Sequence, residues 1–326
     1  MQSRREFLAA SAAAAAFAGA PAIVRAQQPL TEIIWGVLGP SATEWPEYIG
    51  QAKGFFAEQG IKLTTIAAGS PPAVIQQLAT GAMNLASDGS DSVMAAIGRG
   101  LPIKAIAPGF VPNPYQLVVT PQIKTWADLK GKNIMLGTKQ DVTALALQAL
   151  AAQQKMTVDD FSIIVGGNSG ARFTALMSGN VAGAMLAQPF DFQAVDKGMH
   201  VLGSAWDVIH DWQFTTITAN TAWAEKNRDL VVRFLRAYRK SVIFGYAKRD
   251  ESIAALGSET KFDPSILTRA YDLVFGKLKA FDPSLKISTA ALDAVAKSQL
   301  DFGAISAMPK IPDVYDPSYA AEAVKA

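Results

Sequence analysis

The stretch that decides the fold runs from Thr31 to Ala107 and opens with TEIIWGVLGP at residues 31–40. Thr31 to Leu38 is a short apolar run with strand character, and Gly39-Pro40 ends it. Apolar residues then recur at helical spacing from Thr43 to Gln59. The alternation continues, with strands predicted at 61–66, 83–86 and 102–107 and helices at 70–81 and 88–99. Strict alternation with short loops predicts an α/β domain around a mainly parallel sheet.

A second alternation follows, and after it the chain is helical. From Ala222 onward only helical patterns remain, and helices alone cannot complete a sheet, so we expect this tail to pack back on the first domain. Two α/β lobes would then be joined by two crossing strands, with a hinge and a ligand cleft between them. The predicted division gives residues 27–114 and 218–326 to lobe 1 and residues 115–217 to lobe 2, with the crossings near 112–120 and 212–220.

The N-terminus carries an export pattern. Ser3-Arg4-Arg5-Glu6-Phe7-Leu8 is followed by an Ala-rich run over residues 9–20 and by Val24-Arg25-Ala26. This order predicts a twin-arginine signal peptide over residues 1–26, cleaved near Ala26, which places the working protein in the periplasm of a bacterium. The alternative is an uncleaved amphipathic anchor.

Composition excludes several classes of function. Residues 1–26 hold three arginines and one glutamate, so the 30 basic and 28 acidic residues of the chain become 27 and 27 after cleavage. No Lys/Arg block is interleaved with aromatic residues, which argues against a nucleic-acid partner. The chain has no cysteine, and its two histidines, His200 and His210, fit neither a metal-ligand spacing nor a catalytic triad. We therefore expect no cofactor, no metal and no catalysis.

Several short segments, in fixed order, carry a family resemblance. They include Ala52-Lys53-Gly54-Phe55-Phe56, Gln77-Leu78-Ala79-Thr80-Gly81, Ile123 to Lys132, Ala175 to Val181 and Asp313-Val314-Tyr315-Asp316-Pro317. With these segments the chain resembles the periplasmic solute-binding proteins of ABC importers, in the branch for sulfonates, nitrate, taurine and thiamine-precursor pyrimidines. The resemblance implies a type II periplasmic-binding-protein fold, a monomer, a small-molecule solute and an ABC permease of the inner membrane as partner. The chain departs from the family at Asn84 and Gly183, where members often carry Asp.

Candidate ligand contacts lie where strands of the two lobes end. In open parallel sheets, ligands bind beyond the carboxyl ends of the strands, where helix N-termini offer free N–H groups. The loops at these points are rich in Gly, Ser, Thr, Asn and Gln, which can bind an anionic or polar group or can simply cap the helices. The candidate contacts are Ser41, Thr43, Trp45, Ser70, Asp88, Gly89, Ser90, Tyr115, Thr138, Gln140, Thr143, Asn168, Arg172, Gln188 and Phe214.

The donor-rich loops favour a small organic anion, a sulfonate or a carboxylate, bound by hinge closure. The stretch Gly137–Thr143 would form an oxyanion cradle, and Arg172 would either pair with the anion or lie on the surface in solvent. Asp88 would either meet an ammonium group or cap the helix that follows. The alternatives are a pyrimidine-like or amine solute, a ligand-sensing partner of a membrane receptor, and a periplasmic enzyme.

Overall fold

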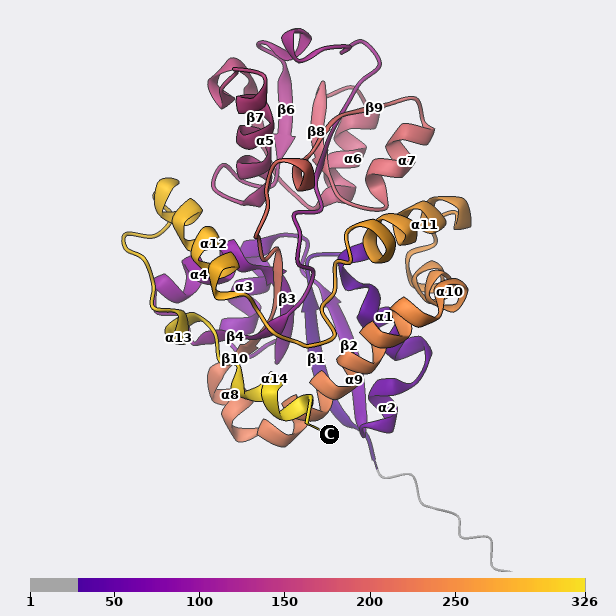
Figure 1. Cartoon of the computed structure of the whole chain (residues 1–326), viewed down its shortest axis with the longest axis vertical. Coiled ribbons are helices and arrows are strands. Elements are labelled where there is room, and N and C mark those ends of the chain that lie inside the picture. Colours follow the sequence, from indigo (N-terminus) through magenta and orange to yellow (C-terminus); the bar gives the residue numbers. More distant parts are fainter. Residues whose placement is uncertain (1–28, 326) are drawn as a thin grey trace, which may run out of the picture.

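The computed structural model describes residues 29–325, which fold around two five-stranded sheets (Figure 1). The strand order is β2-β1-β3-β10-β4 in the first sheet and β7-β6-β8-β5-β9 in the second. The predicted two-lobed α/β class is confirmed. The predicted signal peptide, residues 1–26, lies outside the described residues.

The first sheet combines four strands of the N-terminal part of the described chain with one later strand, β10. Its strands are parallel except for β10, which runs antiparallel to β3 and to β4 and so returns the chain into a sheet formed more than a hundred residues earlier. The strands are β1 (Thr31–Val37), β2 (Ile61–Ala67), β3 (Leu85–Gly89), β4 (Ile103–Pro108) and β10 (Thr215–Asn220).

Alternating side chains of β1 divide the core of this lobe in two. Ile33 and Trp35 face one cluster together with residues of α1, α2 and α9, while Ile34 packs against a second cluster formed by α3 and α4. The helices of the lobe are η1 (Ala42–Glu44), α1 (Trp45–Ala52), α2 (Phe55–Glu58), α3 (Pro71–Ala79), α4 (Ser90–Gly98), α8 (Thr221–Lys226), α9 (Arg228–Ala247), α10 (Arg249–Thr260), α11 (Pro264–Tyr271), η5 (Asp272–Lys277), α12 (Thr289–Asp301), α13 (Ile311–Val314) and α14 (Ser318–Ala323).

The second sheet is smaller and also mixed, because β5 runs antiparallel to both β8 and β9. Its strands are β5 (Gln116–Val119), β6 (Asn133–Leu136), β7 (Ser162–Val165), β8 (Gly183–Leu186) and β9 (His200–Ser204), and its helices are η2 (Trp126–Leu129), α5 (Val142–Gln153), η3 (Val158–Asp160), α6 (Ser169–Met177), α7 (Phe190–Asp196) and η4 (Ala205–Asp207).

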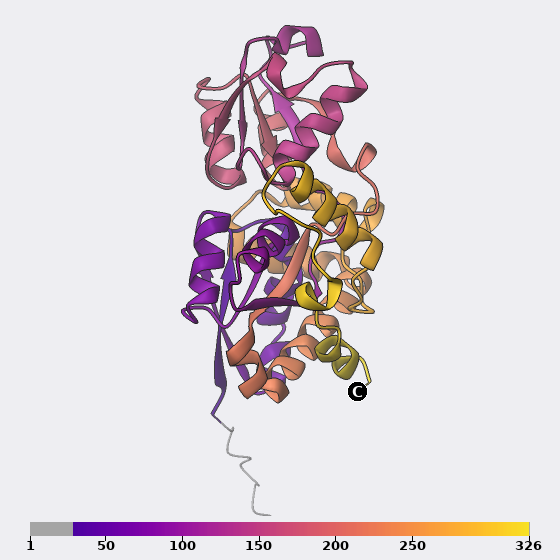
Figure 2. The same ribbon diagram turned by 90° about the vertical axis from the view of Figure 1, so that its left-hand side faces the viewer.

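Two neighbouring segments connect the sheets, and Figure 2 shows the second lobe above the first with the connections between them. The Phe214 amide donates to the Val111 carbonyl at 2.8 Å, and the Thr215 amide donates to the Phe110 carbonyl at 2.9 Å. The crossings are therefore paired with each other at the first lobe. β10 pairs with the first sheet from Thr215 onward, two residues before the predicted end of lobe 2 at residue 217. The limits of the two lobes remain a prediction.

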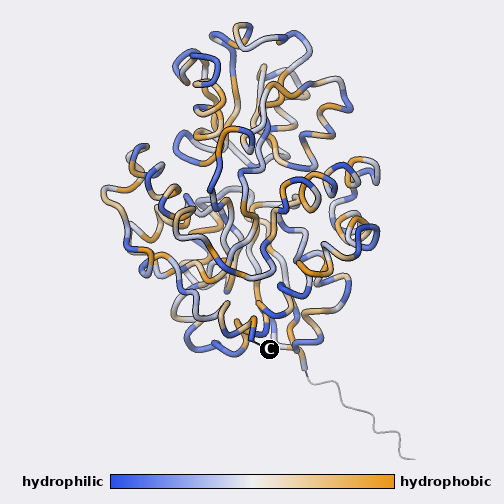
Figure 3. Tube along the Cα trace, viewed as in Figure 1, coloured by the Kyte–Doolittle hydropathy of each residue, from blue (hydrophilic) through white to orange (hydrophobic). Residues whose placement is uncertain are grey.

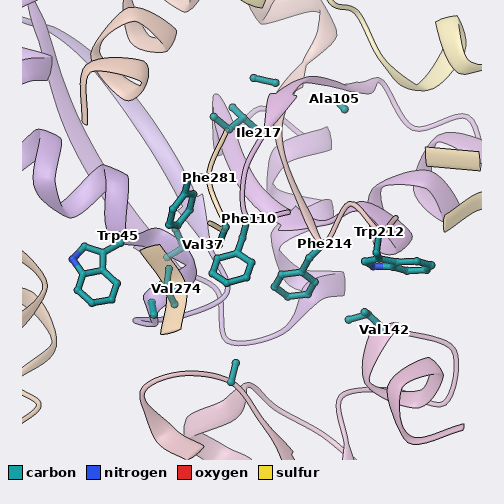
Figure 4. Close-up of a cluster of buried hydrophobic side chains, with 14 of the residues drawn as sticks. Val37, Trp45, Ala105, Phe110, Val142, Trp212, Phe214, Ile217, Val274 and Phe281 are labelled. Carbon is teal, nitrogen blue, oxygen red and sulfur yellow. The ribbon is translucent and has the colours of Figure 1, made fainter. Parts of the chain in front are cut away.

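Aromatic side chains pack where the crossings meet the first lobe (Figure 4). The Phe110 ring lies 6.1 Å from Phe214 and 5.4 Å from Phe281, edge-on to both, so each crossing is fixed to the core by its own ring. Hydrophobic and hydrophilic residues alternate along the outer helices (Figure 3). None of the helices in residues 29–325 combines the length and the hydrophobicity that a membrane span requires.

Two element boundaries differ from the sequence prediction. The helix predicted over 43–59 is interrupted, because Gly54 adopts a left-handed φ of 73° between α1 and α2. The strand predicted at 83–86 instead runs to Gly89, because β10 pairs with it as far as that residue. Asp88 therefore lies inside the strand, and Gly89, not Asp88, occupies the N-cap of α4.

Candidate functional site

A cavity of about 70 Å³ lies between the two lobes. The first lobe contributes the loop after β1, the end of β3 and the start of β10, and the second lobe contributes the N-termini of α6 and α7. The lobes approach closely here, since a Cβ on Gly39 would lie 2.8 Å from the Asn168 side chain. The lining residues are Leu38, Gly39, Pro40, Ser41, Thr43, Glu44, Ser87, Asp88, Gly89, Tyr115, Asn168, Ser169, Ala187, Phe190, Phe214 and Thr215.

A short chain of hydroxyl groups on the first lobe ends at a carboxyl group. Ser41 is the N-cap of η1, and its Oγ lies 2.5 Å from the Thr43 Oγ1. Thr43 Oγ1 donates to Glu44 Oε1 at 3.0 Å, so the single hydroxyl proton of Thr43 is used and Ser41 is the donor in the first contact. This wall of the cavity therefore presents hydroxyl oxygens and a carboxyl group.

Glu44 and Asp88 are the two carboxyl groups of the cavity wall. Their exposed fractions are 3% and 4%, and each has one occupied oxygen: Thr43 donates to Glu44 Oε1, and the Gly89 amide donates to Asp88 Oδ1 at 2.7 Å. Glu44 Oε2 and Asp88 Oδ2 have no hydrogen-bond partner and almost no solvent-accessible surface. A buried acceptor without a donor costs about 1–3 kcal/mol, and both side chains belong to residues that line the cavity.

Burial changes the acidity of both groups. It raises the pKa of Glu44 to about 8, against the lowering effect of the Thr43 and Ser87 hydroxyls. It raises the pKa of Asp88 well above the ordinary value, partly offset by the Gly89 hydrogen bond. Negative charges on Asp91, Glu44 and Asp141 raise it further.

Aromatic rings form another part of the wall. Tyr115 and Phe214 meet edge to face with their ring centres 5.6 Å apart, and both line the cavity. Phe190, at the start of α7, packs on Phe262 of the first lobe at 5.0 Å. The cavity thus combines acidic and hydroxyl groups on the first lobe with apolar surface around them, the usual composition of a small-molecule site.

Arg172 is not where the sequence analysis placed it. The side chain is 1% exposed, so it is not a surface arginine, and it does not line the cavity. Its Nε donates to the Met185 carbonyl at 2.7 Å, Nη1 to the Gly167 carbonyl at 2.7 Å and Nη2 to Ser169 Oγ at 3.2 Å. Arg172 therefore fixes the loop before α6 to the second sheet, with its guanidinium carbon 5.3 Å from the centre of the Tyr115 ring.

The expected oxyanion cradle at Gly137–Thr143 is occupied by the protein's own carboxylates. Asp141 Oδ2 accepts from the Thr138 amide at 2.8 Å, and Asp141 Oδ1 accepts from the Thr143 amide at 2.9 Å. The Val142 amide donates across the cleft to Asp91 Oδ2 at 2.8 Å. Thr138 and Gln140 line a separate cavity of about 230 Å³, and Thr143 is buried among these bonds.

Three of the four remaining candidates outside the cavity have structural partners. Trp45 Nε1 donates to the Ser252 carbonyl at 2.6 Å, whereas Ser70 occupies the N-cap position of α3 without a capping bond from its side chain. Ser90 Oγ donates to the Gln213 carbonyl, and Gln188 Nε2 donates to the Pro114 carbonyl at 3.0 Å. The candidates that the structure brings together at the cavity are Ser41, Thr43, Asp88, Gly89, Tyr115, Asn168 and Phe214.

Sequence reasoning missed Glu44 as a cavity residue. An acidic residue in the first turn of a helix is common because it complements the helix dipole, so Glu44 gives no distinct signal in the sequence. Ser169 and Thr215 were missed as well, although Ser169 lies in a loop that sequence analysis placed at the cleft. The available signal for Glu44 is its position, directly after Ser41 and Thr43, which were both candidate ligand contacts.

Contacts on both flanks hold the lobes together. The Ala42 amide donates to the Gln188 carbonyl at 3.1 Å beside the cavity. On one flank Gln140 Nε2 donates to the Phe302 carbonyl at 2.9 Å, and on the other Arg269 pairs with Asp196 at 2.5 Å. The structure therefore represents a closed arrangement of the two lobes.

The family profile described as NMT1/THI5 like matches residues 42–252, which is more than half of the chain and includes the lining residues from Thr43 to Thr215. The chain belongs to the NMT1/THI5-like family. The family resemblance predicted from the sequence is confirmed.

Solved structures with the same architecture cover almost the whole chain. The ligand-binding component of an ABC-type import system from Staphylococcus aureus, with zinc bound, is 19% identical, covers 91% of this chain and 100% of its own, and has a TM-score of 0.78. The alkanesulfonate-binding protein of Xanthomonas axonopodis pv. citri, bound to MOPS, is 18% identical over 87% of this chain and 98% of its own (TM-score 0.69). The periplasmic nitrate-binding protein of Synechocystis PCC 6803 is 13% identical over 91% and 89% (TM-score 0.73). These likenesses establish the fold.

One curated relative is an enzyme, and it matches only part of this chain. The 4-amino-5-hydroxymethyl-2-methylpyrimidine phosphate synthase of Uromyces fabae is 27% identical over 123 residues. The aligned part spans 36% of this chain and 35% of that relative, so the chain matches about a third of the enzyme's length.

Proposed function

We propose that the protein is a periplasmic solute-binding receptor of an ABC importer, a monomer that closes on a small solute and delivers it to an inner-membrane permease. The observation that carries this proposal is the cavity, which is lined by residues of both lobes and lies beside the paired crossings. The contacts that a solute makes with both lobes exist only when the cleft is closed. A solute therefore shifts the population toward the closed form, and a permease can recognise that form.

The wall of the cavity offers groups that can hold a polar solute by hydrogen bonds. The lining residues include carboxyl groups, hydroxyl groups and an amide, and Glu44 and Asp88 are the candidate general bases among them. Within residues 29–325, no group of three or more His, Cys, Asp or Glu residues is arranged to hold a metal ion. A periplasmic enzyme, for which the curated synthase is the precedent, would have to release a product.

The ligand class expected from the sequence, a small organic anion, corresponds to the alkanesulfonate of one structural neighbour, and a second neighbour binds nitrate, an inorganic anion. In this chain Glu44 and Asp88 lie in the cavity wall, and the three donating nitrogens of Arg172 bind the protein itself. An organic anion would enter this cavity only with both carboxyl groups protonated and donating hydrogen bonds to it.

The test is a thermal-shift screen of residues 27–326 after unfolding and refolding, which removes any solute carried through purification. The screen contains sulfonates, carboxylates, nitrate, pyrimidines and amines. A solute that binds the native state raises the unfolding temperature, and small-angle scattering of the same sample should show a more compact particle. Failure of every solute would contradict the receptor function, and conversion of a bound solute into a released product would establish an enzyme instead. A signalling role would appear as binding without transport when the neighbouring permease is supplied.

A further inference from the structure

Two carboxyl groups, one from each lobe, lie at the start of α5. Asp141 of the second lobe is the N-cap of this helix, and its side chain accepts from the Thr143 amide at 2.9 Å. Asp91, in the first turn of α4 on the first lobe, accepts from the Val142 amide at 2.8 Å. The bond of Asp91 joins the two lobes, so it exists only while the cleft is closed.

Both acids are buried in this closed arrangement. Asp91 is 3% exposed and Asp141 is 7% exposed, and both line the cavity of about 230 Å³ on this flank of the cleft. The walls of that cavity come from α3, α4 and α12 of the first lobe and from the loop before α5 of the second. Opening of the cleft would therefore return water to both carboxyl groups, and closing removes that water, which disfavours their ionised forms.

The charges around Asp91 add to the effect of burial. Burial and the negative charge of Asp141 raise the pKa of Asp91 to about 7, against the lowering effect of the Val142 amide. The α3 and α12 helices contribute only uncharged residues to the cavity beside it. The charged and titratable groups that face Asp91 are Asp88 of β3, Arg99 at the end of α4, Tyr115 before β5, Asp141 and, next to Asp141, Arg172 of α6.

Resting on the hinge closure of the proposed receptor, we infer that Asp91 is a proton-linked latch, which takes up a proton when the lobes close around any solute. The protonated acid keeps one oxygen that can accept from the Val142 amide, so protonation removes the charge without removing the bond. Closing then no longer requires a negative charge to be buried beside Asp141.

The direction of the pH dependence follows from the two states of Asp91. In an open cleft the solvated acid has a pKa near its ordinary value of 3.8, and in the closed cleft the pKa is about 7. Between these pH values the closed form binds more protons than the open form, so the ratio of closed to open molecules rises as pH falls. Above about pH 7 this group is ionised in both forms. The apparent affinity for every solute follows the closed fraction and therefore increases in mildly acidic surroundings.

The test counts closed and open molecules without any solute. The chain has no cysteine, so Gln153→Cys on α5 and Ala290→Cys on α12, two exposed positions on opposite lobes, can carry a pair of dyes. Single-molecule energy transfer in refolded residues 27–326 then gives the ratio of closed to open molecules. From about pH 7.5 to about pH 6 this ratio should rise roughly five- to tenfold more in the wild type than in Asp91→Asn, which keeps the acceptor and has no charge.

Two further variants separate the latch from other buried acids. Asp191 is also buried, and burial raises its pKa to about 7, but both hydrogen-bond partners of its side chain, Gln188 and Phe192, belong to the second lobe. Asp191→Asn should therefore keep the pH dependence of the wild type. Val142→Pro removes the donor of the latch at the first position of α5, where proline is tolerated. Its ratio of closed to open molecules should fall, and more at about pH 7.5 than at about pH 6, because the amide stabilises ionised Asp91.

Equal pH dependence in Asp91→Asn and the wild type would overturn the inference and leave the receptor function intact. Val142→Pro molecules that close as the wild type does would overturn it as well, and this variant carries the test alone if Asp91→Asn does not fold. Loss of the pH dependence in Asp191→Asn would assign the proton to another site. A single distance between the dyes, at every pH and with every solute of the wider screen, would overturn the inference and also count against the receptor function itself.

Discussion

Glu44→Gln should stabilise the protein without ligand, although it removes a group from the binding site. The folded state raises the pKa of Glu44 from an ordinary 4.5 to about 8, so between these pH values the folded chain binds more protons than the unfolded chain. The free energy of unfolding contributed by this residue is therefore largest below about pH 4.5 and falls as pH rises to about 8. With 1.36 kcal/mol per pKa unit, the loss between about pH 5 and about pH 8 is roughly 3–4 kcal/mol.

The glutamine side chain keeps the acceptor for Thr43 and carries no ionisable proton. We expect the difference in unfolding free energy between Glu44→Gln and the wild type to grow by about 3–4 kcal/mol from about pH 5 to about pH 8, which corresponds to roughly 5–10 °C in unfolding temperature. Urea unfolding at several pH values, followed by tryptophan fluorescence, measures this difference. Ionised Glu44 also raises the pKa of Glu47 and of Asp88, so its replacement relieves part of their destabilisation at high pH and changes the difference in the same direction.

Parallel stability profiles for the two proteins would refute the raised pKa of Glu44. A variant less stable than the wild type at about pH 8 would show that the carboxylate has a structural partner and is not held for a ligand. Asp293→Asn serves as the control, because it removes an exposed acid on α12 and should leave the pH profile unchanged.

Three further perturbations test other parts of the structure. Asp91→Ala removes the hydrogen bond between the first lobe and the start of α5, so the ligand-free protein should open. Small-angle scattering should then show a larger radius of gyration, and the apparent affinity for a solute should fall roughly tenfold. An unchanged radius of gyration would contradict this role of Asp91. Arg172→Ala should lower the unfolding free energy by at least about 3 kcal/mol, because three hydrogen bonds of a buried cation are lost. It should not change whether the receptor prefers cationic or anionic ligands. A variant that is as stable as the wild type in urea would show that Arg172 is dispensable. Gly36→Ala should lower the unfolding free energy by about 1–3 kcal/mol, since its Cβ would lie 2.2 Å from the Met83 sulfur. The control Gly276→Ala places its Cβ where no atom lies within 4 Å, so it should change the unfolding free energy little in the same urea assay. Equal effects of the two substitutions would mean that the core has room for a methyl group at β1.

The order of strands and helices could be predicted from the sequence because it depends on local patterns. The spacing of apolar residues from Thr31 to Ala107 indicates which side chains are buried, and it can be recognised within each strand or helix alone. The end of β3 could not be predicted, because it is set by pairing with β10, a strand more than a hundred residues later. The direction of β10 and of β5 against their neighbours depends on the topology of the lobes in the same way.

The site was predictable at the level of loops but not of charges. The loop from Gly39 to Thr43 and the end of β3 reach the cavity, as the rule for strand ends requires. The roles of Arg172 and Glu44 are the reverse of what their types suggest: the arginine fixes a loop, and the glutamate faces the cavity. Both assignments depend on how an element is rotated about its axis and on what lies against it, which a single sequence does not encode locally.

The contacts on the flanks of the cleft affect how tightly the receptor binds every solute, but not which solute it prefers. The bonds of Gln140 to Phe302 and of Arg269 to Asp196 lie outside the cavity, so they stabilise a closed cleft equally whichever solute it holds. They set the fraction of closed receptor before any solute arrives, and the apparent dissociation constant is scaled by that fraction. A substitution on a flank would consequently move the threshold concentration for every solute together and leave their ranking as it was. The concentration range of the receptor can thus be tuned at the cleft's flanks while the cavity remains unchanged.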